Sequence, residues 1–570
     1  MRLVDARRLT GPSHLAERPL VLVDLALDPG ERVDACVDAY VNELSRIRDA
    51  LGLPARVAPI VLPPRRGALV AYEAPIDTML AFAEMSEWAG ESAAEVVGAR
   101  DPLPLEPKQA EVAEMLAQLS SPRLLALAAE AGRRGLPLLW DDERVSVGLG
   151  ARSVCFARSA IPEADAVAWD AVDRVPVAMI TGTNGKTTCT RLLARIAAEA
   201  GHVVGSTSSE GITIAGVEID KGDWTGPAAA RTVLRDPRVT LGVLETARGG
   251  ILRRGLALDR CDAALITNVS GDHVGLEGVD DVAAMTRVKS VIARAVPREG
   301  TVVLNARDAN LVALARNAAT HGISAAITYF ADLERGDAVA AEVIARHVGE
   351  GHSCVVARAG HVVFLEGDVE RPLLSIASIP ITVGGKARYN VENALAAAAM
   401  ARALGLDPAA IERGLEGFAV TDNPGRGQLV EKGGVRIMLD FGHNPEAVRA
   451  VMRLVSELRG PSGELDVIAG CAGDRSDEDF DAMAEGILEA RPRRVFLRDL
   501  PGYLRGRAPG EVPARFRDFF TQHGMSPDRV TVADSEVDAL ERALADAKPG
   551  DFVVLLVHLD HDAVGRFLAS

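Results

Sequence analysis

Eight consecutive residues have the types and spacing of a phosphate-binding loop. They follow a short apolar run, precede an apolar-periodic segment, and read Thr181-Gly182-Thr183-Asn184-Gly185-Lys186-Thr187-Thr188. In such a strand–loop–helix, backbone N–H groups and the positive helix end surround an anion, a lysine reaches the outer phosphates, and a hydroxyl holds Mg²⁺. Ile180 stands where the common pattern has its first glycine. The stretch nevertheless predicts a site for nucleotide phosphates.

Polar residues that directly follow later apolar runs are the next candidates for site residues. Glu245 ends one such run, and Asn268, Asp272 and His273 follow the next. Because a parallel sheet binds its ligands at the carboxyl ends of its strands, we expect these side chains to face the phosphate loop. A carboxylate and an imidazole there would suit a metal ion. Lys289 lies in a helical segment and by itself predicts an exposed side chain.

Two loops in the last quarter of the chain also join a strand-like run to a helix. They read Asp-Phe-Gly-His-Asn-Pro over 440–445 and Gly-Cys-Ala-Gly-Asp-Arg over 470–475. Both are places where a ligand could bind. Cys471 could act as a nucleophile, but no catalytic partner is identifiable, so we interpret it as a small packing residue.

The pattern of apolar residues predicts the elements that position these loops. Residues 1–165 indicate a small α+β unit, 170–418 a wound α/β sheet that becomes richer in β-strands over 339–383, and 419–570 a second α/β unit. The fold class is therefore α/β with several domains. The predicted strands of the two α/β units are 177–180, 203–206, 241–244, 263–267, 301–304, 326–329, 436–439, 465–468, 494–497, 529–532 and 552–556.

Length and composition fit an enzyme of several domains. The 570 residues exceed one ordinary core, with 48% hydrophobic and 25% charged residues. A net charge of −17 argues against a nucleic-acid partner and fits an anionic ligand held by local cations. Six scattered cysteines without a C-x-x-C pair predict neither a disulfide framework nor a zinc site. No leader-like segment and no run of about 18 apolar residues occur, so we expect a cytoplasmic protein without a membrane partner.

Several segments, taken in order, resemble the Mur ligases. They are the phosphate loop, 268–273, Asn390-Val391-Glu392-Asn393, Arg426 and 440–445. Within that superfamily the chain is most similar to the C-terminal half of the cyanophycin synthetases, over about residues 170 to 560. The segments that carry this likeness are KGDWTGP at 221–227, LETARGGILR at 244–253, GDRSDED at 473–479 and LRGR at 504–507.

A fainter likeness extends upstream. Residues 8–12 and 133–150 are similar to the N-terminal domain of the cyanophycin synthetases and to the segment that leads into their ATP-grasp domain. Only about thirty residues separate Gly150 from the phosphate loop, so that domain is expected to be absent. A full cyanophycin synthetase adds aspartate at its ATP-grasp site and arginine at its Mur-type site. The resemblance therefore implies one ATP site here, an N-terminal region that binds the acceptor or serves assembly, and a homodimer or homotetramer.

The resemblance also implies roles for residues at the nucleotide. ATP would be bound by the phosphate loop, Asn268, Asn390, Asn393, Arg426 and Asp440. The catalytic positions would be Lys186, Glu245, His273 and Lys289. The Mg²⁺ ligands would be Thr187, Glu245, His273 and Lys289, the last matching a lysine that many Mur ligases carbamylate.

The substrates are less closely defined. By resemblance, the substrate-binding residues would be Thr225, Arg248, His443, Asn444, Asp474 and Arg475. Phe441-Gly442 replaces the more usual Tyr-Ala, and Cys471-Ala472 replaces a Gly-Pro-like pair, so the identity of the amine stays open.

The implied chemistry is amide formation from a carboxylate and an amine through an acyl phosphate, with ATP and Mg²⁺. The expected acceptor is a peptide or polymer that contains aspartate or glutamate, for example an aspartyl-arginine dipeptide. A γ-polyglutamate or folylpolyglutamate-type ligase is an alternative, although Thr187-Thr188 argues against the folate branch, whose loop typically continues Gly-Ser. A non-catalytic nucleotide-binding protein is the third possibility, disfavoured by Lys186, Glu245 and His273.

Overall fold

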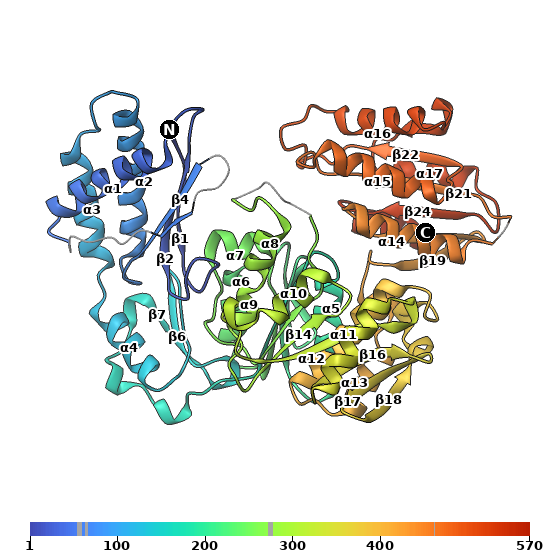
Figure 1. The fold of residues 1–570 in the computed structure, drawn as a ribbon, viewed down its shortest axis with the longest axis horizontal. Coiled ribbons are helices and arrows are strands. Elements are labelled where there is room, and N and C mark those ends of the chain that lie inside the picture. The colour runs from blue at the N-terminus through green and yellow to red at the C-terminus, as the bar shows by residue number, and fades with distance from the viewer. Residues whose placement is uncertain (54–59, 63–66, 272–277, 461) are drawn as a thin grey trace.

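The computed structural model describes residues 1–53, 60–62, 67–271, 278–460 and 462–570 (Figure 1). Its N-terminal unit has an antiparallel sheet with the strand order β1-β2-β4-β3, and two helices pack on one face of this sheet. Two further helices and a small sheet, β5-β6-β7, follow in the chain. This agrees with the expected α+β unit. The elements are β1 (Arg2–Leu9), β2 (Leu20–Ala26), α1 (Val33–Ala50), β3 (Ile60–Leu62), β4 (Gly67–Glu73), α2 (Met79–Val97), α3 (Leu105–Leu119), α4 (Pro122–Arg133), β5 (Leu138–Trp140), β6 (Arg144–Val147) and β7 (Val154–Ala157).

The middle unit is built on one large sheet whose central strands are parallel. The strand order is β11-β10-β9-β12-β8-β13-β14-β15-β16-β17-β18, with antiparallel hairpins added at both edges. Buried apolar side chains alternate along these strands toward helices on both faces, as a doubly covered sheet requires. The strands are β8 (Val177–Thr181), β9 (Val204–Ser208), β10 (Gly211–Ile214), β11 (Val217–Lys221), β12 (Leu241–Glu245), β13 (Ala263–Ile266), β14 (Thr301–Asn305), β15 (Ala326–Asp332), β16 (Ser353–Arg358), β17 (His361–Glu366) and β18 (Val369–Ser375).

The helices of the middle unit divide between the two faces of the sheet. One face packs against α5, α12 and α13, and the other against α6 to α11. They are α5 (Lys186–Glu199), α6 (Pro227–Arg235), α7 (Arg248–Arg254), α8 (Val282–Lys289), α9 (Val291–Arg294), α10 (Ala309–Arg316), α11 (Ala338–Gly349), α12 (Arg388–Ala403) and α13 (Pro408–Glu416).

The interpretation of 339–383 as a β-rich stretch was wrong over about its first quarter. Helix α11 occupies Ala338–Gly349 and buries Ala340, Val343 and Ile344, which have helical spacing. The Asp337 carboxylate caps this helix by accepting the Ala340 N–H over 3.0 Å. The alternating apolar runs 353–357 and 361–365 do correspond to β16 and β17, whereas the cap and the apolar spacing of the preceding segment favour a helix.

The C-terminal unit is a second α/β sheet in the order β19-β20-β24-β21-β22-β23, parallel except for β19. Helices α14, α15 and α16 cover one face, and α17 and α18 the other. The elements are β19 (Gln428–Lys432), β20 (Val435–Asp440), α14 (Pro445–Leu458), β21 (Leu465–Gly470), α15 (Asp477–Glu489), β22 (Arg494–Arg498), α16 (Glu511–Gln522), β23 (Val530–Val532), α17 (Glu536–Ala545), β24 (Phe552–Leu556) and α18 (His561–Ala569). Among the described helices of the whole chain, none is both long and apolar enough to cross a membrane.

The N-terminal unit contacts the middle unit at the end of α7 (Figure 1). The Thr10 N–H donates to the Arg254 carbonyl over 2.8 Å, and the Leu256 N–H donates to the Pro12 carbonyl over 2.7 Å. A Cβ at Gly11 would overlap the Leu256 carbonyl, so the two backbones meet too closely for a side chain. The N-terminal unit thus holds the helix that begins just after Glu245.

Candidate active site

The phosphate loop joins β8 to α5 and depends on two glycines. Gly185 is the N-cap of α5 with φ 84°, and Gly182 has φ 151°. A Cβ at Gly182 would overlap the Thr267 hydroxyl, and a Cβ at Gly185 would overlap Asn393 Oδ1. The loop takes this path because neither position carries a side chain, and its N–H groups lie at the positive end of α5, where an anion binds favourably.

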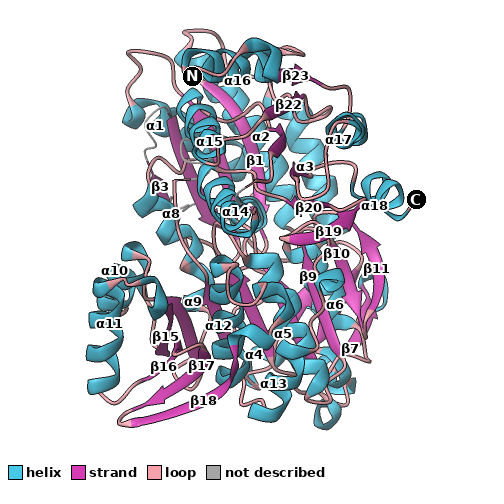
Figure 2. Ribbon diagram, turned by 90° about the vertical axis from the view of Figure 1, so that its right-hand side faces the viewer, coloured by secondary structure: helices cyan, strands magenta, loops and turns pink. Residues whose placement is uncertain are grey.

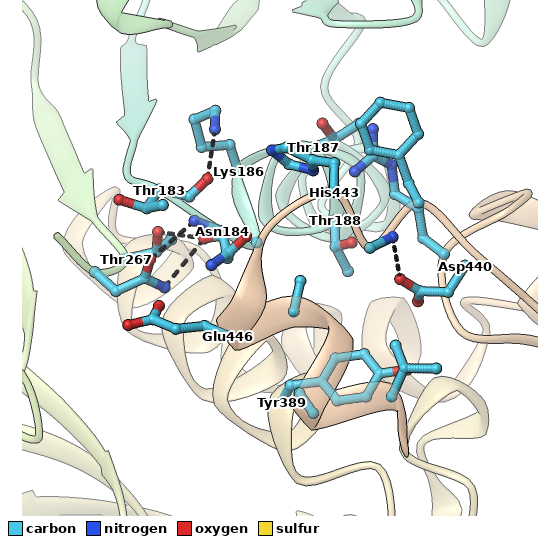
Figure 3. Close-up of a pocket in the computed structure, with 18 of the residues that line it drawn as sticks. Thr183, Asn184, Lys186, Thr187, Thr188, Thr267, Tyr389, Asp440, His443 and Glu446 are labelled. Carbon is cyan, nitrogen blue, oxygen red and sulfur yellow. Dashed lines mark hydrogen bonds between the residues drawn. The ribbon is translucent and has the colours of Figure 1, made fainter. Parts of the chain in front are cut away.

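Residues at the end of β13 hold the loop in place (Figure 3). The Thr267 hydroxyl and the Asn268 side-chain amide both donate to the Asn184 carbonyl, over 2.6 and 3.1 Å. In return, Asn268 Oδ1 accepts the Asn184 N–H over 2.8 Å. Asn268 therefore lies beside the phosphate loop, where the sequence predicted it, with both ends of its amide bonded to the loop backbone.

Lys186, Thr187 and Glu245 lie together where α5 begins and β12 ends. Lys186 Nζ donates to two loop carbonyls over 3.1 and 2.9 Å. The Thr187 hydroxyl is 3.0 Å from that of Ser209, whose N–H donates to Glu245 Oε2 over 3.2 Å. Glu245 is 2% exposed, and its Oε1 has no hydrogen-bond partner among the described residues. A buried carboxylate oxygen of this kind, near a hydroxyl, fits a divalent cation such as Mg²⁺.

Burial dominates the electrostatics of these groups. It raises the pKa of Glu245, against the positive charges of Lys186 and Arg426. It lowers the pKa of Lys186, with the Glu245 carboxylate acting in the opposite direction. For each of the two groups, the charge of the other is the largest effect that opposes the shift caused by burial. A ligand that supplies both an anion and a cation would stabilise both charges.

Lys289 is buried, and the expectation of an exposed side chain was wrong. It is the last residue of α8 and 4% exposed, and its Nζ donates to the Gly182 carbonyl over 2.8 Å. Burial, together with the charges of Lys186 and Arg248, lowers the pKa of Lys289 well below its usual value. Spacing within α8 could not reveal this, because the contact with Gly182 joins residues 107 positions apart in the chain.

Asn390 and Asn393 lie one turn apart on α12 and are bonded to each other. Asn393 Nδ2 donates to Asn390 Oδ1 over 3.1 Å, and Asn390 Nδ2 donates to the Ile381 carbonyl over 3.0 Å. Both line the cavity that contains the phosphate loop. Lys386 and Tyr389 line the same wall, and no motif in the sequence singled them out.

Arg426 connects the middle and C-terminal units. Its Nε donates to Glu210 over 2.9 Å, and its Nη2 donates to the Ser209 hydroxyl over 3.3 Å. Its guanidinium carbon is 4.9 Å from the ring centroid of Phe441. Ser209 and Glu210 were not predicted as site residues, although both directly follow β9, a strand of the parallel sheet, and this is the same signal that identified Glu245.

Asp440 ends β20, and His443 belongs to the loop that follows, which faces the phosphate loop (Figure 3). Burial raises the pKa of Asp440 to about 6, against the charge of Arg426. Its Oδ1 accepts the Gly442 N–H over 2.8 Å. Loss of hydration and the charges of Lys186 and Arg426 lower the pKa of His443 to about 4. The imidazole is therefore neutral at pH 7.

Asn444 joins this loop directly to the phosphate loop. Its Nδ2 donates to Asn184 Oδ1 over 2.8 Å, and Asn184 Nδ2 donates to Asn444 Oδ1 over 3.4 Å. The same Oδ1 accepts the Ala447 N–H over 3.0 Å and so caps α14. Residues of both units therefore enclose one cavity of about 1410 Å³ around the phosphate loop.

The other residues predicted to bind substrate lie at or near this cavity. Thr225 and Arg475 line it, and burial lowers the pKa of Arg475 to about 10. Asp474 is ion-paired with Arg505, which also lines the cavity. Arg248 begins α7, directly after the segment that carries Glu245. These positions agree with a substrate region next to the phosphate loop.

Asp272, His273 and Cys471 are the remaining residues that the sequence singled out. Asp272 and His273 lie outside the described residues, so the metal contact expected of His273 stays a prediction. Cys471 is buried, its sulfur is 3.7 Å from that of Met483, and burial raises its pKa to about 12. An inert packing thiol is the interpretation that these surroundings favour.

The fold and the site together define a class of protein: a phosphate loop on a doubly covered parallel sheet, with a second α/β unit enclosing the same cavity. Residues 180–401 match the Mur ligase middle domain, and residues 425–556 match the Mur ligase, glutamate ligase domain. The chain belongs to the Mur ligase family.

Curated relatives agree with this assignment. The chain is 37% identical over 384 residues to cyanophycin synthetases of Crocosphaera subtropica and Synechocystis, a match that covers 67% of this chain and 42% of each relative. It thus spans about two fifths of the length of these proteins. A UDP-N-acetylmuramoyl-L-alanyl-D-glutamate–2,6-diaminopimelate ligase of Geobacter metallireducens is 28% identical over 451 residues, which are 75% of this chain and 82% of that one.

Solved structures support the fold. Escherichia coli FolC in complex with DHPP and ADP matches 69% of this chain and 88% of its own, with a TM-score of 0.50 and 20% identity. A Mycobacterium tuberculosis folylpolyglutamate synthase complexed with ADP matches 70% of this chain and 91% of its own, with a TM-score of 0.51 and 17% identity. At such identities the likeness concerns the arrangement of the chain alone.

Proposed function

We propose that this protein is an ATP-dependent ligase that joins a carboxylate to an amine. The observation that carries the proposal is the buried group Lys186, Thr187 and Glu245 at the phosphate loop, inside a cavity enclosed by both α/β units. A nucleotide-binding protein without chemistry has no need for a second domain over its phosphates. A ligase needs one, because water would hydrolyse an activated carboxylate.

The phosphate loop would hold ATP with its γ-phosphate near Lys186. Lys186 Nζ donates hydrogen bonds to the Gly182 and Thr183 carbonyls of this loop, so its charge lies at the loop itself. Thr187, Glu245 and, by family resemblance, His273 and a carbamylated Lys289 would hold Mg²⁺, which neutralises charge on the phosphoryl group when bound. Burial of these groups favours positioning and electrostatic stabilisation as the source of catalysis.

The proposed reaction has two steps: transfer of the γ-phosphoryl group to the carboxylate, and then transfer of the acyl group to the amine. A carboxylate oxygen of the acceptor attacks the γ-phosphorus, the bond to the β-phosphate oxygen breaks, and an acyl phosphate and ADP result. The amine nitrogen then attacks the acyl carbon, phosphate leaves, and the nitrogen loses one proton. His443, neutral and on the C-terminal side of the cavity, would flank the incoming amine.

The acceptor we propose is a peptide or polymer that contains aspartate or glutamate, with joining of aspartyl-arginine dipeptides as the leading case. Support comes from the 37% identity to cyanophycin synthetases in the matched region and from Arg475 and Arg505 in the cavity wall. These arginines suit carboxylates.

The test measures phosphate release from ATP and Mg²⁺ across a matrix of acidic peptides and amines, followed by mass spectrometry of each active mixture. We expect a product whose mass shows one new amide bond, lost in Lys186→Ala. The control is Lys548→Ala, which removes an exposed lysine of the C-terminal unit. A product that contains added glutamate would favour a polyglutamate-type ligase, and nucleotide binding without any product would favour a binding protein.

We further propose that the N-terminal unit helps to bind the acceptor, because it holds α7, whose first residue is Arg248. Gly11→Ala would push the two backbones apart at Leu256. We expect a higher KM for the acceptor and an unchanged KM for ATP. The same KM for the acceptor in Gly11→Ala, and full acceptor affinity in a shortened chain that starts near Ala171, would contradict the proposal.

A further inference from the structure

Helix α11 lies on the flank of the middle unit (Figure 2), and three side chains of types that can ligate a metal converge at its end. His347, Glu350 and His352 each offer one ligand atom, and these atoms all lie within 4.8 Å of one another. The strands β15 and β16 adjoin this point at their first residues, whereas the phosphate loop lies at the carboxyl ends of the same sheet. The cluster is therefore separate from the active site.

The backbone fixes this convergence. Gly351 has φ 87°, its N–H donates to the Val348 carbonyl over 2.9 Å, and the His352 N–H donates to the His347 carbonyl over 3.2 Å. This pair of bonds is the Schellman motif, which ends a helix and brings together the side chains three before and two after the cap. Those two positions usually hold apolar residues. Here they hold two imidazoles, stacked with centroids 4.6 Å apart, and the cap itself is Glu350.

The orientation of His347 is also fixed by its surroundings. Its Nε2 is 2.9 Å from the Ile327 carbonyl, and its ring contacts Tyr329 edge-on with centroids 4.7 Å apart. A carbonyl only accepts hydrogen bonds, so Nε2 carries the proton and Nδ1 keeps a free lone pair. A ligating histidine bonded through its other nitrogen to a carbonyl is the usual second-shell arrangement in metal sites.

We propose that His347, Glu350 and His352 form a zinc site at the turn that joins α11 to β16. Two imidazole nitrogens and one carboxylate oxygen are ligands that Zn²⁺ accepts, with water in the fourth tetrahedral position. Mg²⁺ prefers oxygen ligands and would bind poorly here. This site was not predicted from the sequence, because the spacing H-x₄-H becomes a cluster only through the turn at Gly351.

The test is titration of the full chain with ZnCl₂ by calorimetry, in buffer with excess MgCl₂ and ADP to occupy the active site. We expect one Zn²⁺ per chain in the micromolar range and a higher unfolding temperature with Zn²⁺. His352→Ala and Glu350→Gln should each weaken this binding by at least about ten-fold. Both side chains are exposed, so neither change should affect folding.

Two controls separate the site from other binding. His361→Ala removes an exposed histidine elsewhere on the middle unit and should titrate like the wild type. Gly351→Ala keeps all three ligands but strains the turn, and it should weaken Zn²⁺ binding while leaving the KM for ATP unchanged. Equal titration of the wild type, His352→Ala and Glu350→Gln would overturn the proposal, as would the absence of Zn²⁺ binding in the wild type.

Discussion

Replacing Gly185 with alanine tests the phosphate loop most directly. Gly185 and Gly201 flank α5 at its two ends, with φ values of 84° and 90°. A Cβ at Gly185 would overlap Asn393 Oδ1, whereas a Cβ at Gly201 would meet nothing within 4 Å. The two substitutions therefore share the backbone strain and differ in the crowding at the candidate nucleotide site.

The expected magnitudes follow from this difference. A non-glycine residue in the left-handed conformation costs about 1–2 kcal/mol, and both variants should lose that stability. In Gly185→Ala, Asn393 Oδ1 must also move by roughly an ångström, which strains its side-chain hydrogen bond to Asn390, a bond with a net value of about 1 kcal/mol. We therefore expect losses of about 1–2 kcal/mol for Gly201→Ala and about 2–3 kcal/mol for Gly185→Ala.

Nucleotide affinity is the measurement that decides. A fluorescent ADP analogue titrated against each variant, with urea unfolding of the same samples, gives affinity and stability together. We expect Gly185→Ala to bind at least about ten-fold more weakly, equal to 1.4 kcal/mol, and Gly201→Ala to bind like the wild type. If both variants bound the analogue equally, the backbone around Gly185 would not hold the phosphates, and the site as described would be refuted.

Three further predictions concern other parts of the site. Lys289→Met should reduce ligase activity by about 100-fold or more and should remove the carbamate signal that ¹³C-bicarbonate gives in NMR spectra of the wild type. Asn444→Ser keeps a side-chain oxygen that can cap α14 but that cannot reach Asn184. The stability measured by urea unfolding should therefore change little. The value of kcat should fall about five-fold, which corresponds to the loss of one hydrogen bond with a net value of ~1 kcal/mol. For Asp440, the folded-state pKa of about 6 is above the ordinary 3.8, so the folded protein binds this proton more tightly than the unfolded chain does. The contribution of this group to the free energy of unfolding is therefore lost as the pH rises from about 4 to about 6. The wild type should lose roughly 3 kcal/mol of stability over this range that Asp440→Asn does not lose, as measured by urea unfolding of both proteins at each pH.

Much of the fold could be predicted from the sequence, because buried parallel strands leave a local signal. The predicted strands 177–180, 241–244 and 552–556 correspond to β8, β12 and β24 within one residue. The error at α11 arose because β-branched residues are common in buried helices as well as in strands, and only the cap at Asp337 and the spacing distinguish the two.

The candidate site was predicted less completely, and the reason is its geometry. Glu245 and Asn268 follow strands, so the general rule for parallel sheets found them. The burial of Lys289 and the amide pair between Asn184 and Asn444 depend on elements far apart in the chain, and local spacing carries no information about such contacts. Family resemblance supplied Lys289 and Asn444 as site residues, but it did not supply what they touch.

One serine links the candidate metal site to the position of the C-terminal unit. Ser209 contacts the Thr187 hydroxyl, donates its N–H to Glu245, and accepts a hydrogen bond from Arg426, which in turn lies over Phe441. A cation held by Thr187 and Glu245 would therefore act on the same hydroxyl that positions the interdomain arginine. Because coupling between two binding events is reciprocal, a substrate that draws the C-terminal unit closer should also tighten binding of the metal and nucleotide. In the proposed reaction, the carboxylate would then be activated most readily when the unit proposed to supply the amine is already in place.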